Sequence, residues 1–292
     1  MKIVETVAEV REQVKAWRKE GLTVGLVPTM GYLHEGHQSL IAKACAQNDR
    51  VVVSVFVNPT QFGPNEDLES YPRDLEHDAA LCKSTGAALI FHPTPEEMYP
   101  KGFCSFVDMD VLTKELCGLS RPVHFRGVCT VVSKLLHIVQ PDKAYFGEKD
   151  AQQLAVIRRM VLDLNMNVEI VGCPIVRESD GLAKSSRNTY LSPAERKAAL
   201  VLSKSIFAGK QLAEAGETDA AKLVQAMTKI IEAEPLAKID YVKVVDLMTM
   251  QQIPKLDRPF LAAIAVYIGK TRLIDNLSLI HISEPTRLRC IS

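Results

Sequence analysis

The sequence predicts an α/β protein in which a parallel sheet with helices on both faces is followed by a smaller α+β domain. Short apolar runs alternate with helix-periodic segments from residue 24 to residue 176. The run from residue 50 to residue 57 is rich in β-branched residues, as in strands that are buried on both faces. After residue 192 the pattern changes to two long Ala-rich helices and then two strands, which indicates a second domain.

The first domain is expected to span residues 1–176. An amphipathic helix is predicted within residues 1–20, because apolar side chains recur at helical spacing: Val7, Val10, Val14 and Trp17. A strand from Val24, a turn at Pro28 and Gly31, and a helix that includes residues 39–46 come next. The other predicted elements are strands at Arg50–Val57, Ala87–Phe91, Lys143–Phe146 and Val168–Val171 and helices at Leu75–Lys83 and Val128–Val139. Ligands of such sheets bind beyond the carboxyl ends of the strands.

The second domain is expected to span residues 177–276. Ser192-Pro193-Ala194-Glu195 has the form of a helix start, with a capping serine, a proline at the first helical position and the glutamate of a capping box. Helices at about 193–214 and 218–233 and strands at Asp240–Val245 and Phe260–Ile268 complete the domain. Residues 277–292 resemble translated sequencing-adapter DNA and are excluded from the predicted fold. A natural tail of unknown purpose is the alternative.

Charge and cysteine content indicate which binding partners and which cellular compartment are expected. Lys+Arg and Asp+Glu are equal, at 35 each, so no overall charge favours a nucleic-acid or membrane partner, and an anion site must be built locally. The seven cysteines are scattered without Cys-x-x-Cys spacing, which favours reduced thiols in a cytoplasmic protein. No apolar stretch has membrane-spanning length, and residues 1–20 lack the apolar core of a secretion signal.

Two histidines, His34 and His37, lie at the predicted entrance of the helix that follows the Val24 strand. Free backbone N–H groups and the positive end of the helix dipole favour an anion there, and both imidazoles can donate to the same phosphate oxygens. Gly31 and Gly36 let the backbone approach a ligand. The segment therefore predicts a triphosphate site. The alternative is a strand-to-helix turn with two solvent-facing histidines.

The motif Pro-Thr-Met-Gly-x-Leu-His-Glu-Gly-His at residues 28–37 resembles the signature of the pantothenate synthetase (pantoate–β-alanine ligase) family, within the HIGH-type nucleotidyltransferase superfamily. The resemblance covers about residues 1–276 and implies a Rossmann-like first domain. It implies that both histidines act in catalysis. It also implies ATP binding by this segment, through Met30, Gly31, His34, Gly36 and His37.

Asn58-Pro59-Thr60-Gln61 directly follows the buried strand, so Gln61 should lie at the carboxyl edge of the sheet. Its amide offers donors and an acceptor to a small ligand with hydroxyl and carboxylate groups, and a polar turn is the alternative. The resemblance implies that Gln61 binds pantoate near β-alanine. The stretch from Arg121 to Val128 has a close counterpart in the family, but neither a structural nor a catalytic role is favoured for it.

The segment from Tyr145 to Gln153 again follows a strand and enters a helix. Lys149 offers a compact cation for phosphate oxygens, Asp150 offers acceptors for ribose hydroxyls, and Gln153 can reach the same edge one helical turn later. The alternative is a charged helix N-terminus whose acidic residues favour the dipole. The resemblance implies that Gln153 binds pantoate and that this segment and the end of the next strand bind ATP, through Gly147, Glu148, Lys149, Asp150 and Val176.

Asp180 to Asn188 includes two serines flanked by cations, in a loop that contains Gly181. Such a loop can close over phosphates and stabilise charge on a leaving pyrophosphate, and a solvated basic loop is the alternative. The loop resembles the second signature of the superfamily, Lys-Met-Ser-Lys-Ser. The resemblance implies ATP contacts from Lys184, Ser185, Ser186 and Arg187, with catalytic roles for Lys149 and the last three. Family members often have an apolar residue in place of Lys184.

Together these features imply an ATP-dependent ligase. Pantoate and ATP would give pantoyl-adenylate and pyrophosphate, and β-alanine would then displace AMP to form pantothenate. Such chemistry needs charge stabilisation and alignment rather than a covalent nucleophile, and the sequence has no recognisable nucleophile set. The resemblance also implies Mg²⁺, held largely by phosphates, and a homodimer. Another nucleotidyltransferase of the superfamily and a non-catalytic nucleotide-binding module are the alternatives; pyrophosphate release with and without pantoate separates the three.

Overall fold

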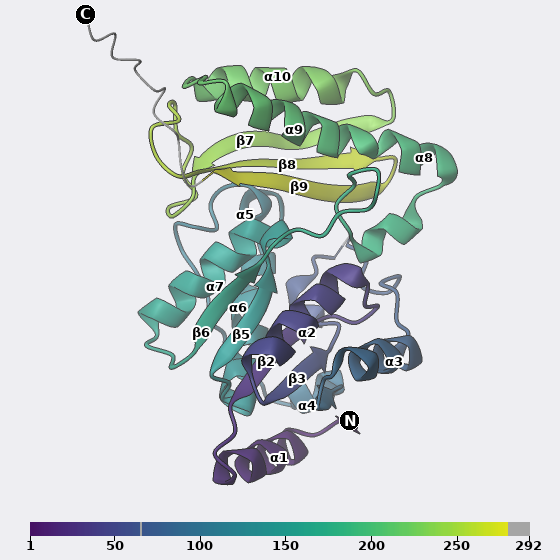
Figure 1. Cartoon of the computed structure of the whole chain (residues 1–292), viewed down its shortest axis with the longest axis vertical. Coiled ribbons are helices and arrows are strands. Elements are labelled where there is room, and N and C mark those ends of the chain that lie inside the picture. Colours follow the sequence, from purple (N-terminus) through teal and green to yellow (C-terminus); the bar gives the residue numbers. More distant parts are fainter. Residues whose placement is uncertain (65, 280–292) are drawn as a thin grey trace, which may run out of the picture. The chain divides into compact units, whose positions relative to one another are not determined.

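The computed structural model describes residues 1–64 and 66–279 (Figure 1). They form two compact units. The first consists of Met1–Val176 and Lys184–Ser186, and the second of Arg177–Ala183 and the described residues from Arg187 onward. No helix in these described ranges is both long and apolar enough to cross a membrane.

The first unit is built on a six-stranded parallel sheet in the order β1-β4-β3-β2-β5-β6, which confirms the predicted fold class. The strands are β1 (Lys2–Val4), β2 (Val24–Thr29), β3 (Arg50–Val55), β4 (Leu89–Phe91), β5 (Lys143–Gly147) and β6 (Glu169–Cys173). The chain runs from β2 outward to β3 and β4, and then returns to place β5 on the other side of β2. The topological switch point therefore lies between the carboxyl ends of β2 and β5, where open α/β sheets bind their ligands.

Helices cover both faces of this sheet (Figure 1). Helices α2 and α3 pack together against one face, where their side chains join alternate strand residues such as Val27, Val53 and Ile90 in one buried cluster. Helix α6 packs against both α1 and α7, which we assign to the opposite face because parallel crossovers are right-handed. The helices are α1 (Val7–Lys19), α2 (Glu35–Gln47), α3 (Leu75–Thr85), α4 (Pro95–Met98), α5 (Cys117–Ser120), α6 (His124–Val139) and α7 (Ala151–Asp163), with 3₁₀ turns η1 (Pro59–Gln61) and η2 (Glu148–Asp150).

The amino terminus shows what the sequence pattern captured and what it missed. Helix α1 forms as predicted, with Val10, Val14 and Trp17 buried. It is preceded by the short strand β1, which was not predicted and which pairs in parallel with β4. Thr6 separates the two elements, because its side chain accepts from the Glu9 N–H and closes a capping box. Three residues are too few for a period-2 pattern to emerge.

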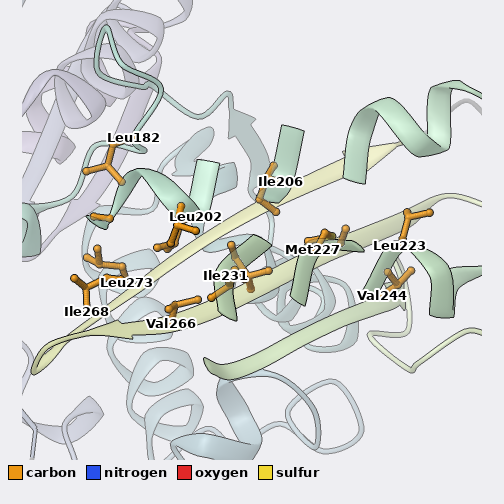
Figure 2. Close-up of a cluster of buried hydrophobic side chains, with 14 of the residues drawn as sticks. Leu182, Leu202, Ile206, Leu223, Met227, Ile231, Val244, Val266, Ile268 and Leu273 are labelled. Carbon is orange, nitrogen blue, oxygen red and sulfur yellow. The ribbon is translucent and has the colours of Figure 1, made fainter. Parts of the chain in front are cut away.

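The second unit packs helices on one antiparallel sheet in the order β7-β8-β9. Its helices are α8 (Pro193–Ala198), α9 (Leu200–Glu214) and α10 (Ala220–Glu232), after the 3₁₀ turn η3 (Ser186–Tyr190), and its strands are β7 (Ala237–Asp246), β8 (Phe260–Ile268) and β9 (Thr271–Leu279). Figure 2 shows side chains from the helices, such as Leu202 and Ile231, meeting side chains from the sheet, such as Val266 and Leu273, in one apolar cluster. Capping by Ser192 and Glu195 starts α8, as the sequence predicted.

Strand β9 differs from the expectation in two ways. It was not predicted at all, because polar residues such as Asp275 and Asn276 interrupt its apolar pattern, although Gly269, with φ of 58°, marks a tight hairpin turn before it. It also runs past the expected end of the fold at Asn276, since residues 277–279 pair with Phe260–Ala262 of β8. The boundary drawn at Asn276 therefore lies three residues too early. The rest of the adapter-like stretch, residues 280–292, lies outside the described residues.

An ion pair inside the second unit fixes the segment that leads to Lys184. Both guanidinium NH groups of Arg177 donate to Asp275 of β9, over 2.7 and 2.8 Å. Arg177 also donates to the Gly181 carbonyl oxygen over 3.0 Å, and its guanidinium lies 5.1 Å from the centre of the Phe207 ring. The buried Asp275 carboxylate thus has a charged hydrogen-bonding partner. The same contacts hold residues 177–183 on the second unit.

Candidate active site

The turn between β2 and α2 lies at the switch point and has an unusual backbone. Gly31 and Tyr32 both have left-handed φ values, 84° and 51°. Glycine adopts this conformation easily, whereas a tyrosine needs support from its surroundings. The turn receives such support from within the first unit, because the Tyr32 and Leu33 N–H groups both donate to Asp78 of α3.

His34 and His37 together form the cap of α2. His34 is the N-cap residue, and its Nδ1 accepts from the Gly36 N–H over 3.1 Å. The His34 N–H in turn donates to Nδ1 of His37 over 3.3 Å. Each Nδ1 is therefore an acceptor and carries no proton, so in the neutral ring the proton sits on Nε2. The two rings lie close together, with centroids 4.1 Å apart.

Both imidazoles are held in the neutral form. Burial, with the positive charge of Lys149, lowers the pKa of His34 to about 4. Burial, followed by the influence of His34 and of Lys149, lowers the pKa of His37 well below its ordinary value. At neutral pH the pair thus offers two Nε2–H donors beside free helix N–H groups, which suits an anion that brings its own charge. This confirms the predicted geometry of a helix entrance, and ligand binding there remains a prediction.

Lys149 and Asp150 follow β5, the strand next to β2. They lie in η2, which leads directly into α7. Lys149 is close enough to act electrostatically on both histidines of the turn. The Asp150 carboxylate is exposed and makes no capping hydrogen bond to α7, although Asp150 is the N-cap residue of that helix. Asp150 therefore does not cap α7 through a hydrogen bond, whereas the alternative interpretation, in which its charge favours the helix dipole, needs no such bond and stays open.

The two adjacent glutamines of α7 have different surroundings. Gln152 is buried, accepts from the Cys117 N–H over 2.9 Å, and donates to the carbonyl oxygens of Leu112 and Glu115. It is therefore a structural residue that holds the loop before α5. Gln153 is only partly buried, and within the described residues its side chain makes no hydrogen bond. Its amide thus remains available, in agreement with the choice of the second glutamine as the ligand-binding one.

Gln61 lies in η1, after β3, and is buried. Its Oε1 accepts from Nδ2 of Asn58 over 3.0 Å, which fixes the amide so that Nε2 lies on the side away from that bond. Nε2 lies 3.2 Å from Sδ of Met30, so the β3 edge meets the β2 turn. The Tyr99 hydroxyl holds Asn58 in place, donating to Asn58 Oδ1 over 2.6 Å. Neither Asn58 nor Tyr99 has a role predicted from the sequence, although Asn58 opens the motif.

The Arg121–Val128 stretch proves to support Gln61. His124 Nδ1 donates to the Gln61 carbonyl oxygen over 3.1 Å, and its Nε2 accepts from Arg121 over 3.2 Å. Burial and the neighbouring Arg121 lower the pKa of His124 to about 4. Arg121 also pairs with Glu66 through two nitrogens. A Cβ on Gly127 would collide with the Thr60 carbonyl oxygen, so only glycine lets α6 approach η1 this closely.

The serine-bearing loop contributes residues 184–186 to the first unit. The Lys184 N–H donates to the Val176 carbonyl oxygen over 2.9 Å, and its ammonium lies 3.0 Å from a carboxylate oxygen of Glu35, the first residue of α2. The buried Ser186 hydroxyl donates to the Tyr32 carbonyl oxygen over 3.3 Å. These contacts bring the two segments that are predicted to bind phosphate together. Arg187 belongs to the second unit.

The fold and this site together define an α/β protein of the nucleotide-binding type, with a helix entrance suited to an anion at the switch point of a parallel sheet. The family model described as pantoate–β-alanine ligase matches residues 2–278. A pantothenate synthetase from Ruminiclostridium cellulolyticum is 67% identical over 280 residues, which cover 96% of this chain and 99% of the relative. The chain belongs to the pantoate–β-alanine ligase family, and it is an enzyme that joins pantoate to β-alanine.

Solved structures agree with this assignment. Pantothenate synthetase from Thermus thermophilus has a TM-score of 0.90 and 47% sequence identity, with coverage of 96% of this chain and 100% of that one. A pantoate–β-alanine ligase from Francisella tularensis, solved in complex with beta-gamma ATP and β-alanine, has a TM-score of 0.79 and 35% identity, with coverage of 95% and 97%.

Proposed function

We propose that this chain activates pantoate with ATP and forms pantothenate through a pantoyl-adenylate, releasing pyrophosphate and then AMP. A carboxylate does not acylate an amine at neutral pH, because its leaving group would be oxide. Adenylation replaces that leaving group with AMP. The observation that carries the proposal is the pair of neutral imidazoles, His34 and His37, whose Nε2–H groups are left over after their Nδ1 atoms have capped α2.

In this mechanism the protein supplies alignment and charge stabilisation. The Nε2–H groups donate to phosphate oxygens as negative charge grows on the leaving pyrophosphate, and Lys149 adds a cation at the same helix entrance. Ser185, Ser186 and Arg187 complete the phosphate contacts. The other proposed ATP contacts come from residues that line the carboxyl edge of the sheet or the loop before Ser185: Met30, Gly31, Gly36, Gly147, Glu148, Asp150, Val176 and Lys184.

Gln61 and Gln153 are proposed to hold pantoate. Gln61 is suited to this role because Asn58 binds its amide oxygen, so that its NH₂ group faces the ligand as a donor for a carboxylate or hydroxyl oxygen. Gln153 projects from the first turn of α7, one helical turn after Lys149 and Asp150. Pantoate held by these amides would place its carboxylate toward the α-phosphate, so the first step needs no β-alanine.

Mg²⁺ is proposed to accompany ATP. Mg²⁺ is usually bound through substrate phosphates, with one or two carboxylates and water, and the helix entrance fits this pattern because the carboxylate of Asp150 lies near His34 beside the lysines. When bound, the ion would neutralise charge on the phosphates. We also propose a cytoplasmic homodimer: the family resemblance implies the dimer, and the scattered cysteines, without Cys-x-x-Cys spacing, favour a reducing compartment.

The test of the mechanism is pantoate-dependent exchange of labelled pyrophosphate into ATP, with β-alanine left out. The proposal predicts exchange that requires pantoate and not β-alanine. Gln153→Ala should raise the pantoate concentration needed for exchange by about tenfold or more, because an unpaired polar group in a site costs on the order of 1–3 kcal/mol. Lys149→Ala should act mainly through ATP. Exchange that demands β-alanine, or that proceeds without pantoate, would rule the adenylate route out.

A further inference from the structure

We propose that His77 and Asp78, neighbours on α3, are positioning residues for the β2–α2 turn: they hold the backbone of Tyr32 and Leu33 and thereby fix the placement of the His34 imidazole. The inference rests on the proposed function of His34 and His37. Nothing in the sequence motif points to these two residues, since they lie more than forty positions away on a helix that carries no part of the signature.

Asp78 is a buried carboxylate whose partners are backbone N–H groups. Asp78 as a whole residue is only 1% exposed. Oδ2 accepts from the Tyr32 N–H over 2.9 Å, and Oδ1 accepts from the Leu33 N–H over 2.6 Å. In the part of the chain that the structure describes, no lysine or arginine forms an ion pair with it. Burial raises the pKa of this carboxyl, and the two hydrogen bonds oppose that rise.

His77 forms a further hydrogen bond to the turn. Its Nε2 lies 3.0 Å from the Leu33 carbonyl oxygen, and because a carbonyl can only accept, Nε2 carries the proton. Two adjacent residues of α3 thus bind three polar groups of two adjacent turn residues. The polar groups of this turn lie outside any regular ladder, so they need partners of this kind.

The turn needs an external support because of its own backbone. Tyr32 has φ of 51°, which is unfavourable for a residue with a side chain, and it follows the left-handed Gly31. A Cβ on Gly31 would lie only 3.0 Å from Asp78 Oδ2, so the turn is packed directly on the carboxylate. Asp78 therefore selects this conformation over the more common ones.

The support of the turn fixes the position of the His34 imidazole, which is proposed to contact the ligand. Leu33 is followed immediately by His34, whose ring caps α2 and contacts His37. A displacement of about 1 Å in a group that aligns a reaction can cost up to about a hundredfold in rate. His77 and Asp78 act only through the backbone of the turn, so they are positioning residues and not catalytic ones.

The test compares Asp78→Asn with Asp74→Ala in the full-length chain. Asparagine has nearly the same shape, but it offers one acceptor and turns an NH₂ group toward the second backbone N–H. We expect pantoate-dependent pyrophosphate exchange at saturating substrates to fall at least tenfold. Asp74 caps the same helix by accepting from the His77 N–H over 3.0 Å, so Asp74→Ala should lower the melting temperature while exchange stays within twofold of the parent.

His77 provides a second pair of variants in case Asp78→Asn does not fold. His77→Ala should lower exchange about threefold to tenfold, whereas His77→Gln, which keeps a donor, should stay within twofold. The proposal is overturned if Asp78→Asn or His77→Ala exchanges within twofold of the parent, or if Asp74→Ala loses as much as Asp78→Asn. A parent without exchange would instead contradict the adenylate mechanism, and the same variants would then be compared in overall pantothenate formation.

Discussion

In the described residues three helices begin with a reciprocal capping box, and one of the three boxes is chemically different. Helix α8 in the second unit uses Ser192 and Glu195: the Glu195 N–H donates to the serine hydroxyl over 3.3 Å, and the Ser192 N–H donates to the glutamate over 2.9 Å. Helix α1 uses Thr6 and Glu9 in the same way. Helix α2 in the first unit has the same pattern of bonds, but both side chains are histidines.

The difference lies in what each side chain has left once the helix has been capped. The glutamates of the ordinary boxes are acceptors only, and they have no N–H to offer to an anion. An imidazole has two nitrogens on different edges of its ring. In α2 the Nδ1 atoms cap the helix, and the Nε2–H groups remain for a ligand. The same arrangement that only starts a helix at α1 and α8 thus leaves two N–H donors at α2, which is what the proposed anion site needs.

The largest expected effect comes from separating the two nitrogens of His37. In His37→Asn the amide oxygen can replace Nδ1 as the acceptor for the His34 N–H, but the Nε2–H donor is lost. Exchange of pyrophosphate should fall by two or more orders of magnitude, because a donor aimed at developing charge is worth roughly 3–4 kcal/mol. The melting temperature should stay close to that of the parent.

The matched control removes an ordinary box. Glu195→Ala should cost about 1 kcal/mol of stability and leave exchange within twofold of the parent. Near-normal pyrophosphate release by His37→Asn would show that the histidine box, like the serine box, serves the helix alone.

Acid should lower the stability of the first unit at a pH at which the Thr6–Glu9 and Ser192–Glu195 capping boxes stay intact. The pKa of buried His124 is about 4 in the fold, against 6.5 for a free imidazole. The unfolded chain therefore binds more protons between pH 6.5 and 4, so stability is lost as the pH falls through that range. The loss from His124 should be on the order of 3 kcal/mol by pH 4, and His34 and His37 should add to it.

Denaturant unfolding at pH 7 and at pH 4 measures this loss. His124→Asn, which keeps a donor for the Gln61 carbonyl oxygen, should flatten the dependence. No histidine occurs in the described part of the second unit. Equal acid sensitivity of parent and His124→Asn would contradict the assignment.

A truncation within β9 tests whether the second unit can lose stability while the His34–His37 cap of α2 keeps its proposed function. A chain that ends at Asn276 lacks Leu277 and Leu279, which pack partly buried against the second-unit core. Compared with a chain that ends at Leu279, it should be about 1–2 kcal/mol less stable. Exchange at 25 °C should be equal in the two chains. Identical melting temperatures would mean that the fold does end at Asn276.

The smallest effect concerns the charge at the first position of α2. Glu35 favours the helix dipole but opposes an incoming triphosphate, and its largely exposed side chain pairs with the less exposed Lys184. Exposed pairs are worth at most about 1 kcal/mol, so Glu35→Gln should lower the KM for ATP by no more than about fivefold. Glu76→Gln, in the first turn of α3, is the control and should change nothing. A higher KM in Glu35→Gln would mean that the pair itself orders the site.

Much of the fold follows from the sequence because burial leaves a pattern. The β-branched run of β3 and the apolar stripe of α1 have no other good explanation, and the parallel sheet follows from their alternation. Strand β1 is too short to show a pattern. Strand β9 carries polar residues whose burial becomes acceptable only through distant partners, as when Arg177 pairs with Asp275. Tertiary partners of this kind cannot be read from local sequence.

The site divides in the same manner. His34, His37, Gln61 and Lys149 are predicted site residues because each follows a strand and enters a helix or turn. The prediction of Gln153 rather than Gln152 as the ligand-binding residue comes from the family resemblance, and it agrees with the hydrogen bonds that occupy the Gln152 amide. That histidines cap α2 was not predicted, since histidine is not a usual N-cap residue. The support from Asp78 depends on a contact across 46 positions of the sequence.

The central claim is that Nδ1 of His34 and of His37 caps α2 while each Nε2–H stays available for a ligand. Measuring the tautomeric state of the two imidazoles tests this claim most directly. Long-range proton–nitrogen NMR correlations of the ligand-free protein at pH 7, assigned through the His34→Asn and His37→Asn variants, report which ring nitrogen carries the proton. The account predicts that both rings are neutral and protonated at Nε2, and that the Nε2 signals shift when a non-hydrolysable ATP analogue is added while the Nδ1 signals stay near their positions. A proton on Nδ1 of either ring, alone or in a doubly protonated imidazolium, would contradict it.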